Sequence, residues 1–286
     1  MGKAVNTLIC TAPAKLNLFL HVVGRRADGY HLLQTLFCFI GLSDTLRFTM
    51  RPDGIVRRIN GPESVPEEQD LCVLAARMLQ QETGCSFGVD IELEKKIPLG
   101  GGLGGGSSDA ATTLLALNRL WDLGLKRDGL MRMGLVLGAD VPVFVFGENA
   151  LAEGVGEQLL AYPVPDAWYV VLFPPEHVAS KQIFMQPDLT RNTISFRIRG
   201  LSERQLLAAH NDLEPVVCHL YPEVARYLAC LGQFTKARMT GSGACVFADF
   251  TSESDALSVL SRLPPDMRGV VAHGLSHHPL RDFVAE

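Results

Sequence analysis

The sequence of 286 residues lacks features that would mark other classes of protein. It has no basic excess, since 26 Lys and Arg face 31 Asp and Glu, and a net charge of −5 provides no general field for a nucleic-acid backbone. It has no long apolar run: its most apolar windows, 16–23 and 32–42, contain polar residues and fall short of the roughly 18 to 20 residues that cross a bilayer. We therefore expect a soluble protein that binds neither nucleic acid nor membrane.

The seven cysteines lack CxxC spacing, and their odd number does not suit a disulfide framework. This usage predicts inert, buried thiols in a reducing cytoplasm. The apolar stretch after Lys3 is interrupted by polar residues and by Pro13, so we expect no secretory signal. His273, His277 and His278 have no cysteine or acidic partner at metal spacing, which predicts surface histidines and no structural metal.

With 47% hydrophobic and 20% charged residues, the chain can bury a sizeable core in one large or two modest domains. Helical and strand patterns are mixed along it without an internal repeat. A linker is predicted at Pro163, Pro165 and Asp166, where prolines interrupt the periodic patterns. The sequence thus predicts an α+β protein with domains at 1–161 and 162–286.

Apolar periodicity and turn residues locate the individual elements. Strands are expected at 8–23 with a break at 12–14, followed by a turn at 27–29, and at 89–94, 168–173 and 245–250. Helices are expected at 71–83, from 107 or 108 to 124, and at 128–137, 202–210 and 223–231. In the second of these helices, Ser107 or Ser108 is the expected cap, Asp109 lies in the first turn, and Gly124 is the expected end.

Residues 100–106 contain six glycines among seven positions and lead directly into the second helix. Bare backbone N–H groups before a helix N-terminus favour an anionic ligand, so a polyphosphate is expected, while a flexible hinge or a tight corner is the alternative. A Walker loop is excluded because Ser107 rather than lysine follows Gly106. A dinucleotide fold is disfavoured because the preceding strand alternates charged and apolar residues instead of being buried on both faces.

Two polar positions could complement this loop. Lys15 and Asn17 lie two residues apart, hence on one face of an extended segment, which is either a solvated face or a source of the cation that the loop lacks. Asp140, between Gly138 and Pro142, is equally well explained as a turn or N-cap residue and as a functional carboxylate.

Two further segments have an ordinary interpretation and a functional one. Tyr30 and His31 follow the turn at 27–29 and could be surface residues or offer an aromatic face to a ligand. The small residues 240–243 precede a strand and form either a plain hairpin corner or a second approach to phosphate.

In combination, these segments resemble the three motifs of the GHMP kinases in order and spacing. The motifs are Ala12-Pro13-Ala14-Lys15-Leu16-Asn17, Pro98 through Ser108, and Thr240-Gly241-Ser242-Gly243. Other stretches resemble the branch of that family that acts on a cytidine-diphosphate-linked methylerythritol: Gly29-Tyr30-His31, Leu36-Phe37, Gly138 through Pro142, Arg191-Asn192-Thr193 and Asn211 through Glu214. The resemblance spans nearly the whole chain.

The resemblance implies a two-domain fold with the active site in the interdomain cleft and a final strand that can return to the first domain. It implies transfer of the ATP γ-phosphate to a hydroxyl of the cytidine-linked alcohol, in the non-mevalonate route to isoprenoid precursors, with ATP as co-substrate and Mg²⁺ on the phosphates. Asp140 would be the base that accepts the hydroxyl proton. Lys15 would keep Asp140 ionised and stabilise the transferred phosphoryl group.

The same resemblance assigns binding residues. The acceptor pocket would be lined by Asn17, Tyr30, His31, Phe37 and Phe184. Lys95 would lie beside the adenine, and the nucleotide would otherwise be held by Pro98, Gly100, Gly101, Gly102, Leu103, Gly104, Gly105, Gly106, Ser107 and Ser108. Two positions depart from many relatives: Asp70 replaces Asn near the adenine, and Ser180 replaces Thr before Phe184.

Two other functions compete with this one. A GHMP kinase for another alcohol, such as homoserine or mevalonate, is disfavoured by Tyr30-His31 and by residues 211–214. A non-catalytic nucleotide-binding protein is disfavoured because Lys15 and Asp140 are both present, and a pure binder needs no base beside an acceptor. The sequence leaves the oligomeric state open.

Overall fold

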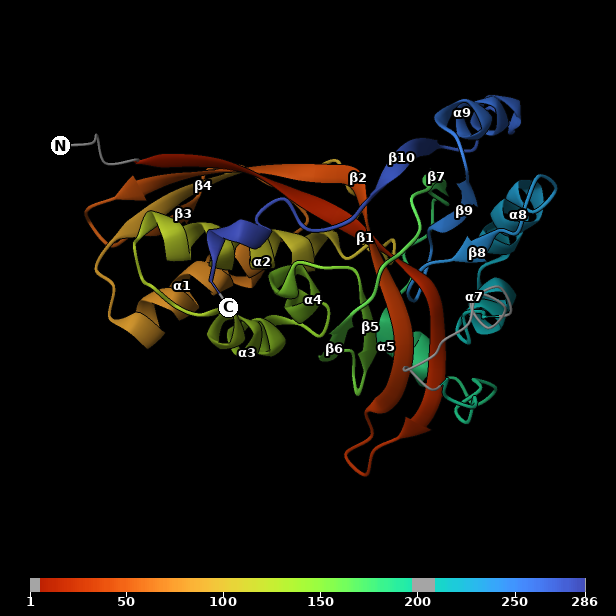
Figure 1. The fold of residues 1–286 in the computed structure, drawn as a ribbon, viewed down its shortest axis with the longest axis horizontal. Helices are drawn as coiled ribbons and strands as arrows, with labels where there is room; N and C mark the ends of the chain where they lie inside the picture. Colours follow the sequence, from red (N-terminus) through yellow and green to blue (C-terminus); the bar gives the residue numbers. More distant parts are fainter. Residues whose placement is uncertain (1–5, 197–208, 286) are drawn as a thin grey trace.

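The computed structural model describes residues 6–196 and 209–285. Within these ranges ten strands form one continuous sheet, flanked by helices (Figure 1). The strands are β1 (Thr7–Arg25), β2 (His31–Arg51), β3 (Val56–Arg58), β4 (Gly88–Glu94), β5 (Ala150–Glu153), β6 (Gln158–Ala161), β7 (Trp168–Leu172), β8 (Arg238–Met239), β9 (Val246–Phe250) and β10 (Gly269–Leu275). The helices are α1 (Leu71–Thr83), α2 (Gly105–Leu120), α3 (Arg127–Leu137), α4 (Val141–Phe146), α5 (Ser180–Phe184), α7 (Glu214–Leu220), α8 (Pro222–Leu231) and α9 (Glu253–Arg262), with short 3₁₀ turns at Glu67–Gln69 and Arg281–Phe283. None of these helices is long and apolar enough to cross a membrane.

The molecule has two halves, the first built around α1 to α4 and the second around α7 to α9. The strands β1 and β2 form a long antiparallel hairpin that passes through both halves (Figure 1). Its tip is the expected turn at 27–29, where Gly29 adopts a φ of 92° that side chains disfavour. The expected break at 12–14 is a shift in pairing register between Pro13 and Ala14 inside one continuous strand. Lys15 and Asn17 follow this irregularity, so the hairpin itself positions them.

The first half packs α1 to α4 against the sheet formed by β1, β2 and β4 (Figure 1). Helix α1 agrees with the expectation: the Asp70 side chain accepts hydrogen bonds from Cys72 N and Val73 N, and Gly84 ends the helix in a left-handed conformation. Asp70 also pairs with Arg58 at 2.8 Å. The residue that departs from many relatives is therefore a buried helix cap.

Helix α2 differs from the expectation at both ends. It begins at Gly105, with Gly104 in a left-handed conformation as its N-cap, and no side chain caps it. The predictions that Ser107 or Ser108 caps this helix and that Asp109 lies in its first turn are therefore wrong, because the glycines themselves enter the helix. It also ends at Leu120 rather than Gly124, since Asp122 turns the chain with a φ of 53°.

The second half packs α7, α8 and α9 against β7 and β9 (Figure 1). The expected strands at 168–173 and 245–250 are confirmed as β7 and β9, and the expected helix at 223–231 is confirmed as α8. The expected helix at 202–210 lies outside the described residues except for its last two positions. The domain boundary after residue 161 remains a prediction.

The end of the chain crosses between the two halves. Strand β10 pairs with β7 over residues 269–273 and with β2 through Gly274 and Leu275. Beyond it, Leu280 and Val284 are buried in the core of the first half. The prediction that His278 is a surface residue is wrong: it is 0% exposed, because this returning segment packs its ring against Phe39 and Phe144. Its backbone N–H donates a hydrogen bond to Gly147 O at 2.8 Å.

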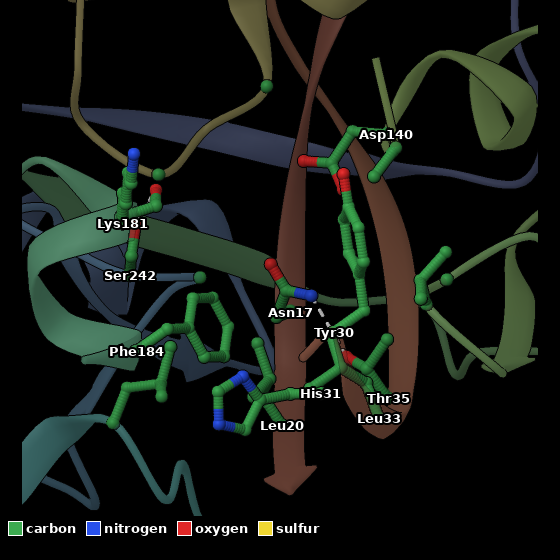
Figure 2. A pocket seen from close by; sticks show the side chains of 18 of the residues that line it. Asn17, Leu20, Tyr30, His31, Leu33, Thr35, Asp140, Lys181, Phe184 and Ser242 are labelled. Carbon is green, nitrogen blue, oxygen red and sulfur yellow. Dashed lines mark hydrogen bonds between the residues drawn. The ribbon is translucent and has the colours of Figure 1, made fainter. Parts of the chain in front are cut away.

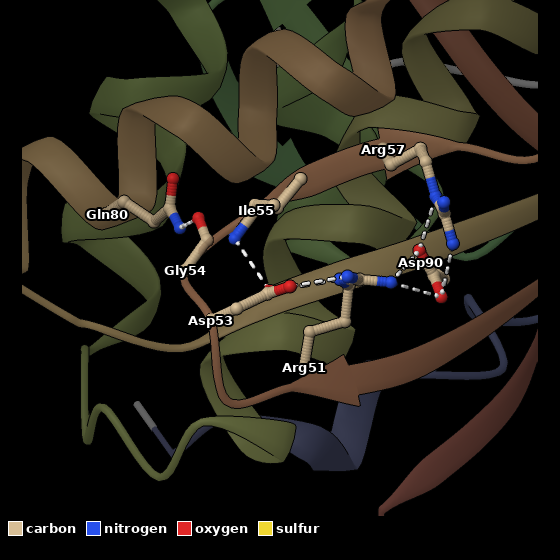
Figure 3. Close-up of polar contacts among 7 residues, drawn as sticks. All are labelled: Arg51, Asp53, Gly54, Ile55, Arg57, Gln80 and Asp90. Atoms are coloured by element: carbon tan, nitrogen blue, oxygen red, sulfur yellow. Dashed lines mark hydrogen bonds and ion pairs between the residues drawn. The ribbon is translucent and has the colours of Figure 1, made fainter.

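A charged cluster ties three strands of the first half together (Figure 3). The Asp90 carboxylate on β4 accepts hydrogen bonds from Arg51 at the end of β2 and from Arg57 on β3, with distances between 3.0 and 3.2 Å. Burial raises the pKa of Asp90, but the two guanidinium groups outweigh burial and leave it below its ordinary value. The cluster holds β3, a strand of three residues, against its neighbours.

Candidate active site

A cleft of about 870 Å³ opens between the β1–β2 hairpin, the glycine loop at 100–104 and α5 (Figure 2). A smaller hollow of about 220 Å³ lies along the same loop. The sequence-predicted residues that line the cleft are Lys15, Asn17, Tyr30, His31, Phe37, Gly100, Gly102, Gly104, Ser107, Asp140 and Phe184. Those that line only the smaller hollow are Pro98, Gly101, Leu103, Gly105 and Gly106.

Lys15 and Asp140 meet at one side of the cleft. Lys15 is buried, with 2% of its surface exposed, and its ammonium lies 3.2 Å from Asp140 Oδ2. The same ammonium donates to Asn17 Oδ1 at 2.6 Å and to Gly102 O at 2.9 Å. Asp140 stands at the N-cap position of α4 but makes no capping hydrogen bond, so the plain N-cap interpretation does not account for its side chain.

A buried threonine fixes the neighbouring amide. Asn17 Nδ2 donates to Thr35 Oγ1 at 2.9 Å, and the Thr35 hydroxyl donates to Phe19 O. This chain of donors leaves the Asn17 oxygen directed at Lys15, as Figure 2 shows for the contact with Thr35. Phe37 lies beneath the ammonium, with its ring centre 5.5 Å from Lys15 Nζ. Lys15 and Asn17 are therefore a buried, ordered pair rather than a solvated face.

The glycine loop needs glycine for its conformation and its close contacts. Gly100, Gly102 and Gly104 have φ values of 69°, 75° and 72°. A Cβ at Gly102 would lie 2.3 Å from Thr240 O, and a Cβ at Gly104 would lie 3.0 Å from Lys15 Cε. The backbone N–H of Lys15 donates to Leu103 O at 3.0 Å, which attaches the loop to β1. The loop is therefore a packed cradle at the start of α2 and not a hinge.

The second small-residue loop, 240–243, packs directly on this cradle. Cys245 N donates to Gly101 O at 3.1 Å, and Asn17 N donates to Thr240 Oγ1 at 2.9 Å. Asn211 Nδ2 supports the loop from behind by donating to Met239 O and Gly241 O at 2.9 and 2.8 Å. Because Gly241 and Ser242 line the cleft, the loop is part of the site rather than a plain hairpin corner.

The opposite end of the cleft is aromatic. His31 stacks on Phe184 with ring centres 5.0 Å apart, whereas the Tyr30 side chain, which is exposed, is directed away from this pair and toward Asp140 (Figure 2). Arg191 Nε donates to His31 Nε2 at 3.1 Å, an arrangement that requires the neutral imidazole. Burial lowers the pKa of His31, and the positive charges of Arg191 and Arg25 lower it further. A planar base can therefore be bound here by stacking and by uncharged hydrogen-bonding groups.

Two expected nucleotide contacts do not reach the cleft. The Lys95 ammonium pairs with Asp44 and with Asp109, the latter at 2.8 Å. Burial lowers the pKa of Lys95, but the two carboxylates outweigh burial and raise it. Burial also raises the pKa of Asp109 to about 7. Ser108 is fully buried in α2 and lines neither hollow. That Lys95 lies beside adenine stays a prediction.

Sequence reasoning missed several residues that shape the site. Asp44 is fully buried, and its Oδ1 accepts hydrogen bonds from Lys96 N at 2.6 Å and Ile97 N at 2.8 Å, just before the glycine loop. Thr35 and Asn211 hold Asn17 and the 240–243 loop, as described above. No local pattern identifies Asp44 or Thr35, because their partners lie on other strands or loops. Asn211 had a signal, since it belongs to a stretch that the family resemblance uses.

Comparison with known proteins agrees with this geometry. Residues 70–148 match the family model of the GHMP kinases N terminal domain, and residues 192–267 match that of the GHMP kinases C terminal. The chain is 59% identical over 282 residues to the 4-diphosphocytidyl-2-C-methyl-D-erythritol kinase of Nitrosospira multiformis, covering 98% of this chain and 95% of the relative. It is also 59% identical to the kinase of that name from Thiobacillus denitrificans, covering 96% of this chain and 98% of the relative.

Solved structures show the same likeness. The crystal structure of a 4-(cytidine 5'-diphospho)-2C-methyl-D-erythritol kinase superposes with a TM-score of 0.79 at 33% identity, covering 93% of this chain and 99% of the other. A homoserine kinase from Cytophaga hutchinsonii superposes with a TM-score of 0.72 at 17% identity, covering 97% of each chain. The second likeness concerns the fold alone.

Proposed function

The chain belongs to the GHMP kinases and, within them, to the family of 4-diphosphocytidyl-2-C-methyl-D-erythritol kinases, and from this premise we propose how its cleft works. The protein is an ATP-dependent kinase that phosphorylates a hydroxyl of 4-diphosphocytidyl-2-C-methyl-D-erythritol to give the 2-phosphate. This reaction is a step of the methylerythritol route to isoprenoid precursors.

One observation carries the mechanism. A lysine and a carboxylate, 3.2 Å apart, lie in the same cleft as a glycine cradle that opens a helix. Phosphoryl transfer requires positioning and neutralisation of charge more than covalent chemistry by the protein. A helix N-terminus supplies unpaired N–H groups for phosphate oxygens, the lysine supplies positive charge, and the carboxylate supplies a base. The three groups together are sufficient for a kinase.

The transfer then proceeds in line. Asp140 accepts the proton of the acceptor hydroxyl, the alcohol oxygen forms a bond to the γ-phosphorus, and the bond from that phosphorus to the β-phosphate oxygen breaks to release ADP. Lys15 holds the Asp140 carboxylate in place through their ion pair. Its charge also favours the equatorial oxygens of the transferred group, on which negative charge is spread in the transition state.

The aromatic end of the cleft suits the cytidine. Phe184 and His31 offer stacking surfaces, and the Tyr30 ring lines the cleft nearer Asp140 (Figure 2). Asn17 and Phe37 line the cleft next to the Lys15 ammonium, beside the expected position of the methylerythritol chain. The nucleotide would follow the glycine loop, with Lys95 on the adenine side.

Oxygen donors for Mg²⁺ are present where the phosphates would lie. Mg²⁺ commonly keeps several waters and binds one or two carboxylates together with substrate phosphates. Asp140 and the hydroxyl of Ser107 both line the cleft and fit this requirement. When bound, the ion would neutralise charge on the ATP phosphates. We also place the enzyme in the reducing cytoplasm, since all seven cysteines are free and four of them are buried.

A substrate panel with ATP labelled at the γ-phosphate tests the function. Label should pass to 4-diphosphocytidyl-2-C-methyl-D-erythritol and not to homoserine or mevalonate. Transfer to one of the other alcohols would assign a different GHMP kinase activity. Binding of an ATP analogue with no transfer to any alcohol would indicate a non-catalytic nucleotide-binding protein.

A further inference from the structure

The cleft contains a lysine that the catalytic groups do not use. Lys181 on α5 lines the cleft, and its side chain is exposed. Figure 2 shows its ammonium directed toward the glycine loop, beside Ser242 and away from Asp140. Within residues 6–196 and 209–285 the ammonium has no hydrogen-bond or ion-pair partner. A charged group at the wall of a binding cleft is thus free to bind a ligand.

Lys15, the other lysine that lines the described cleft, has no spare donor. An ammonium group has three N–H bonds, and those of Lys15 are directed at Asn17, Gly102 and Asp140. Lys15 can act on a phosphate as a charge, but a new hydrogen bond would displace one of these partners. Lys181 has no such commitment.

The position of Lys181 relates it to one part of the acceptor. It stands three residues before Phe184 on the same helix, so the two side chains leave neighbouring positions about 5 to 6 Å apart. Phe184 belongs to the aromatic end, where the base is proposed to stack. Ser180, the residue before Lys181, shares a hydrogen bond with Ser242 at 2.6 Å and ties α5 to the 240–243 loop. Lys181 therefore lies between the base pocket and the loops that face the reacting phosphate.

We propose that Lys181 binds the diphosphate of the cytidine-linked acceptor, an inference that rests on the proposed function. A nucleoside diphosphate whose base lies against Phe184 carries its phosphates one ribose away, on the side where Lys181 stands. A flexible ammonium suits such a group as a mobile point charge with three donors. The triphosphate of ATP approaches from the glycine loop, while the acceptor diphosphate approaches from α5. The positive charge of Lys181 also reduces the electrostatic repulsion between these two groups.

The test is a series of ligands that differ in phosphate number. Cytidine, CMP and CDP are titrated into the wild type, Lys181→Met and Lys181→Arg, with a non-hydrolysable ATP analogue as a fourth ligand. Lys181→Met should weaken CDP binding about tenfold and leave cytidine and the ATP analogue within twofold, since charge-assisted hydrogen bonds to phosphate are lost. Lys181→Arg should restore most of the CDP affinity. In turnover, Lys181→Met should raise KM for the acceptor about tenfold with kcat nearly unchanged.

A matched control removes an equal charge elsewhere. Lys96 is exposed and pairs with Glu94 at 3.3 Å outside the cleft, so Lys96→Met should bind all four ligands like the wild type. Wild-type CDP affinity in Lys181→Met would overturn the inference, as would an equal loss for cytidine and CDP, which indicates a structural role of α5. A loss confined to the ATP analogue would overturn it by assigning Lys181 to the donor nucleotide. The proposed function fails separately, if the wild type itself neither binds CDP nor phosphorylates the cytidine-linked alcohol.

Discussion

Lys15 is buried with a full set of oxygen partners, and this explains how a charge is tolerated inside the protein. A buried ammonium is strongly destabilising unless it is paired and hydrogen-bonded. Asn17, Gly102 and Asp140 come from three different segments and converge on this one group. The ion pair is therefore an ordered part of the fold before any substrate binds, and binding need not assemble it.

Asp140→Asn tests the base at this scale. The amide keeps the shape of the side chain but cannot accept the hydroxyl proton, so kcat should fall about 10²-fold or more, within the range that a positioned base contributes. Affinity for a non-hydrolysable ATP analogue should stay within a few-fold. Steady-state kinetics and equilibrium titration measure the two effects separately.

Asp122→Asn is the matched control for this substitution. Asp122 is exposed, lies outside the cleft, and has a φ of 53° that asparagine also tolerates. The variant should show wild-type kcat. If Asp140→Asn also turned over at the wild-type rate, Asp140 would have no role as the base.

At the scale of elements, the glycine loop and the 240–243 loop behave as one unit. Each loop leaves no space for a side chain on the other, since a Cβ at Gly102 would lie 2.3 Å from Thr240 O and a Cβ at Gly241 would lie 3.0 Å from Gly102 O. The phosphate cradle is thus formed by two segments more than a hundred residues apart. Its shape depends on backbone contacts that any side chain would disturb.

Gly102→Ala should consequently weaken both the fold and the cradle. The new methyl group would displace Thr240 O. The alanine would also have to keep the left-handed backbone conformation of Gly102, a strain of about 1 to 2 kcal/mol in itself. We expect loss of stability on urea unfolding by about 2 kcal/mol or more and at least tenfold weaker binding of an ATP analogue. If the Gly102→Ala variant bound the analogue with unchanged affinity, this site would be rejected for the phosphates.

Gly129→Ala serves as the control for a glycine substitution. Gly129 lies inside α3, where an added Cβ meets only Arg132 Nη2 at 3.9 Å. Alanine should be neutral there or stabilise the protein by about 0.5 to 1 kcal/mol, because it favours the helix. Nucleotide binding should not change.

At the scale of the whole molecule, two packed halves share one sheet. The β1–β2 hairpin extends through both, β10 pairs with β2 and β7, and the last segment returns to the first core (Figure 1). The cleft is lined by the hairpin and by residues of both halves. Groups buried by the returning segment should therefore affect the stability of the entire protein rather than of one loop.

His278 makes this dependence measurable through pH. Burial, together with smaller contributions from Arg127 and His277, lowers its pKa to about 3, and its Nδ1 accepts a hydrogen bond from Leu280 N at 3.0 Å. Between about pH 6.5 and pH 3 the unfolded chain binds a proton here that the folded chain does not. The free energy of unfolding should thus decrease as pH falls through this window, by up to about 1.4 kcal/mol per pH unit from this one group.

His278→Asn isolates this contribution. Asparagine retains an acceptor for Leu280 N but does not titrate, so the variant should be less stable at neutral pH and should lose less stability between pH 6.5 and 5 than the wild type. Urea unfolding at several pH values measures both slopes. His21, whose pKa burial also lowers, is common to both proteins and cancels in the comparison. Identical slopes would show that His278 is not buried in its neutral form.

The sequence by itself determined the elements that depend on local physics. Helix α1 ends at Gly84 because glycine readily adopts the left-handed conformation, and β4 alternates buried and exposed residues because one face lies on the core. The glycine-rich run and its position before a helix indicated an anion site, since exposed N–H groups need no distant partner to be recognised. The family resemblance named Lys15 and Asp140 as an interacting pair, whereas their local patterns left a solvated face and a turn residue as alternatives.

Only the tertiary structure decided the rest, because the partners are far apart in the chain. Gly105 and Gly106 enter α2 against their low helix propensity, in a segment held by contacts to Lys15 and to residues 240–243. The Lys95 ammonium is held by two buried carboxylates, one of them on another strand, and His278 is buried by a chain end that crosses the molecule. Local patterns carry no information about such contacts, whereas the packing of the folded chain selects them.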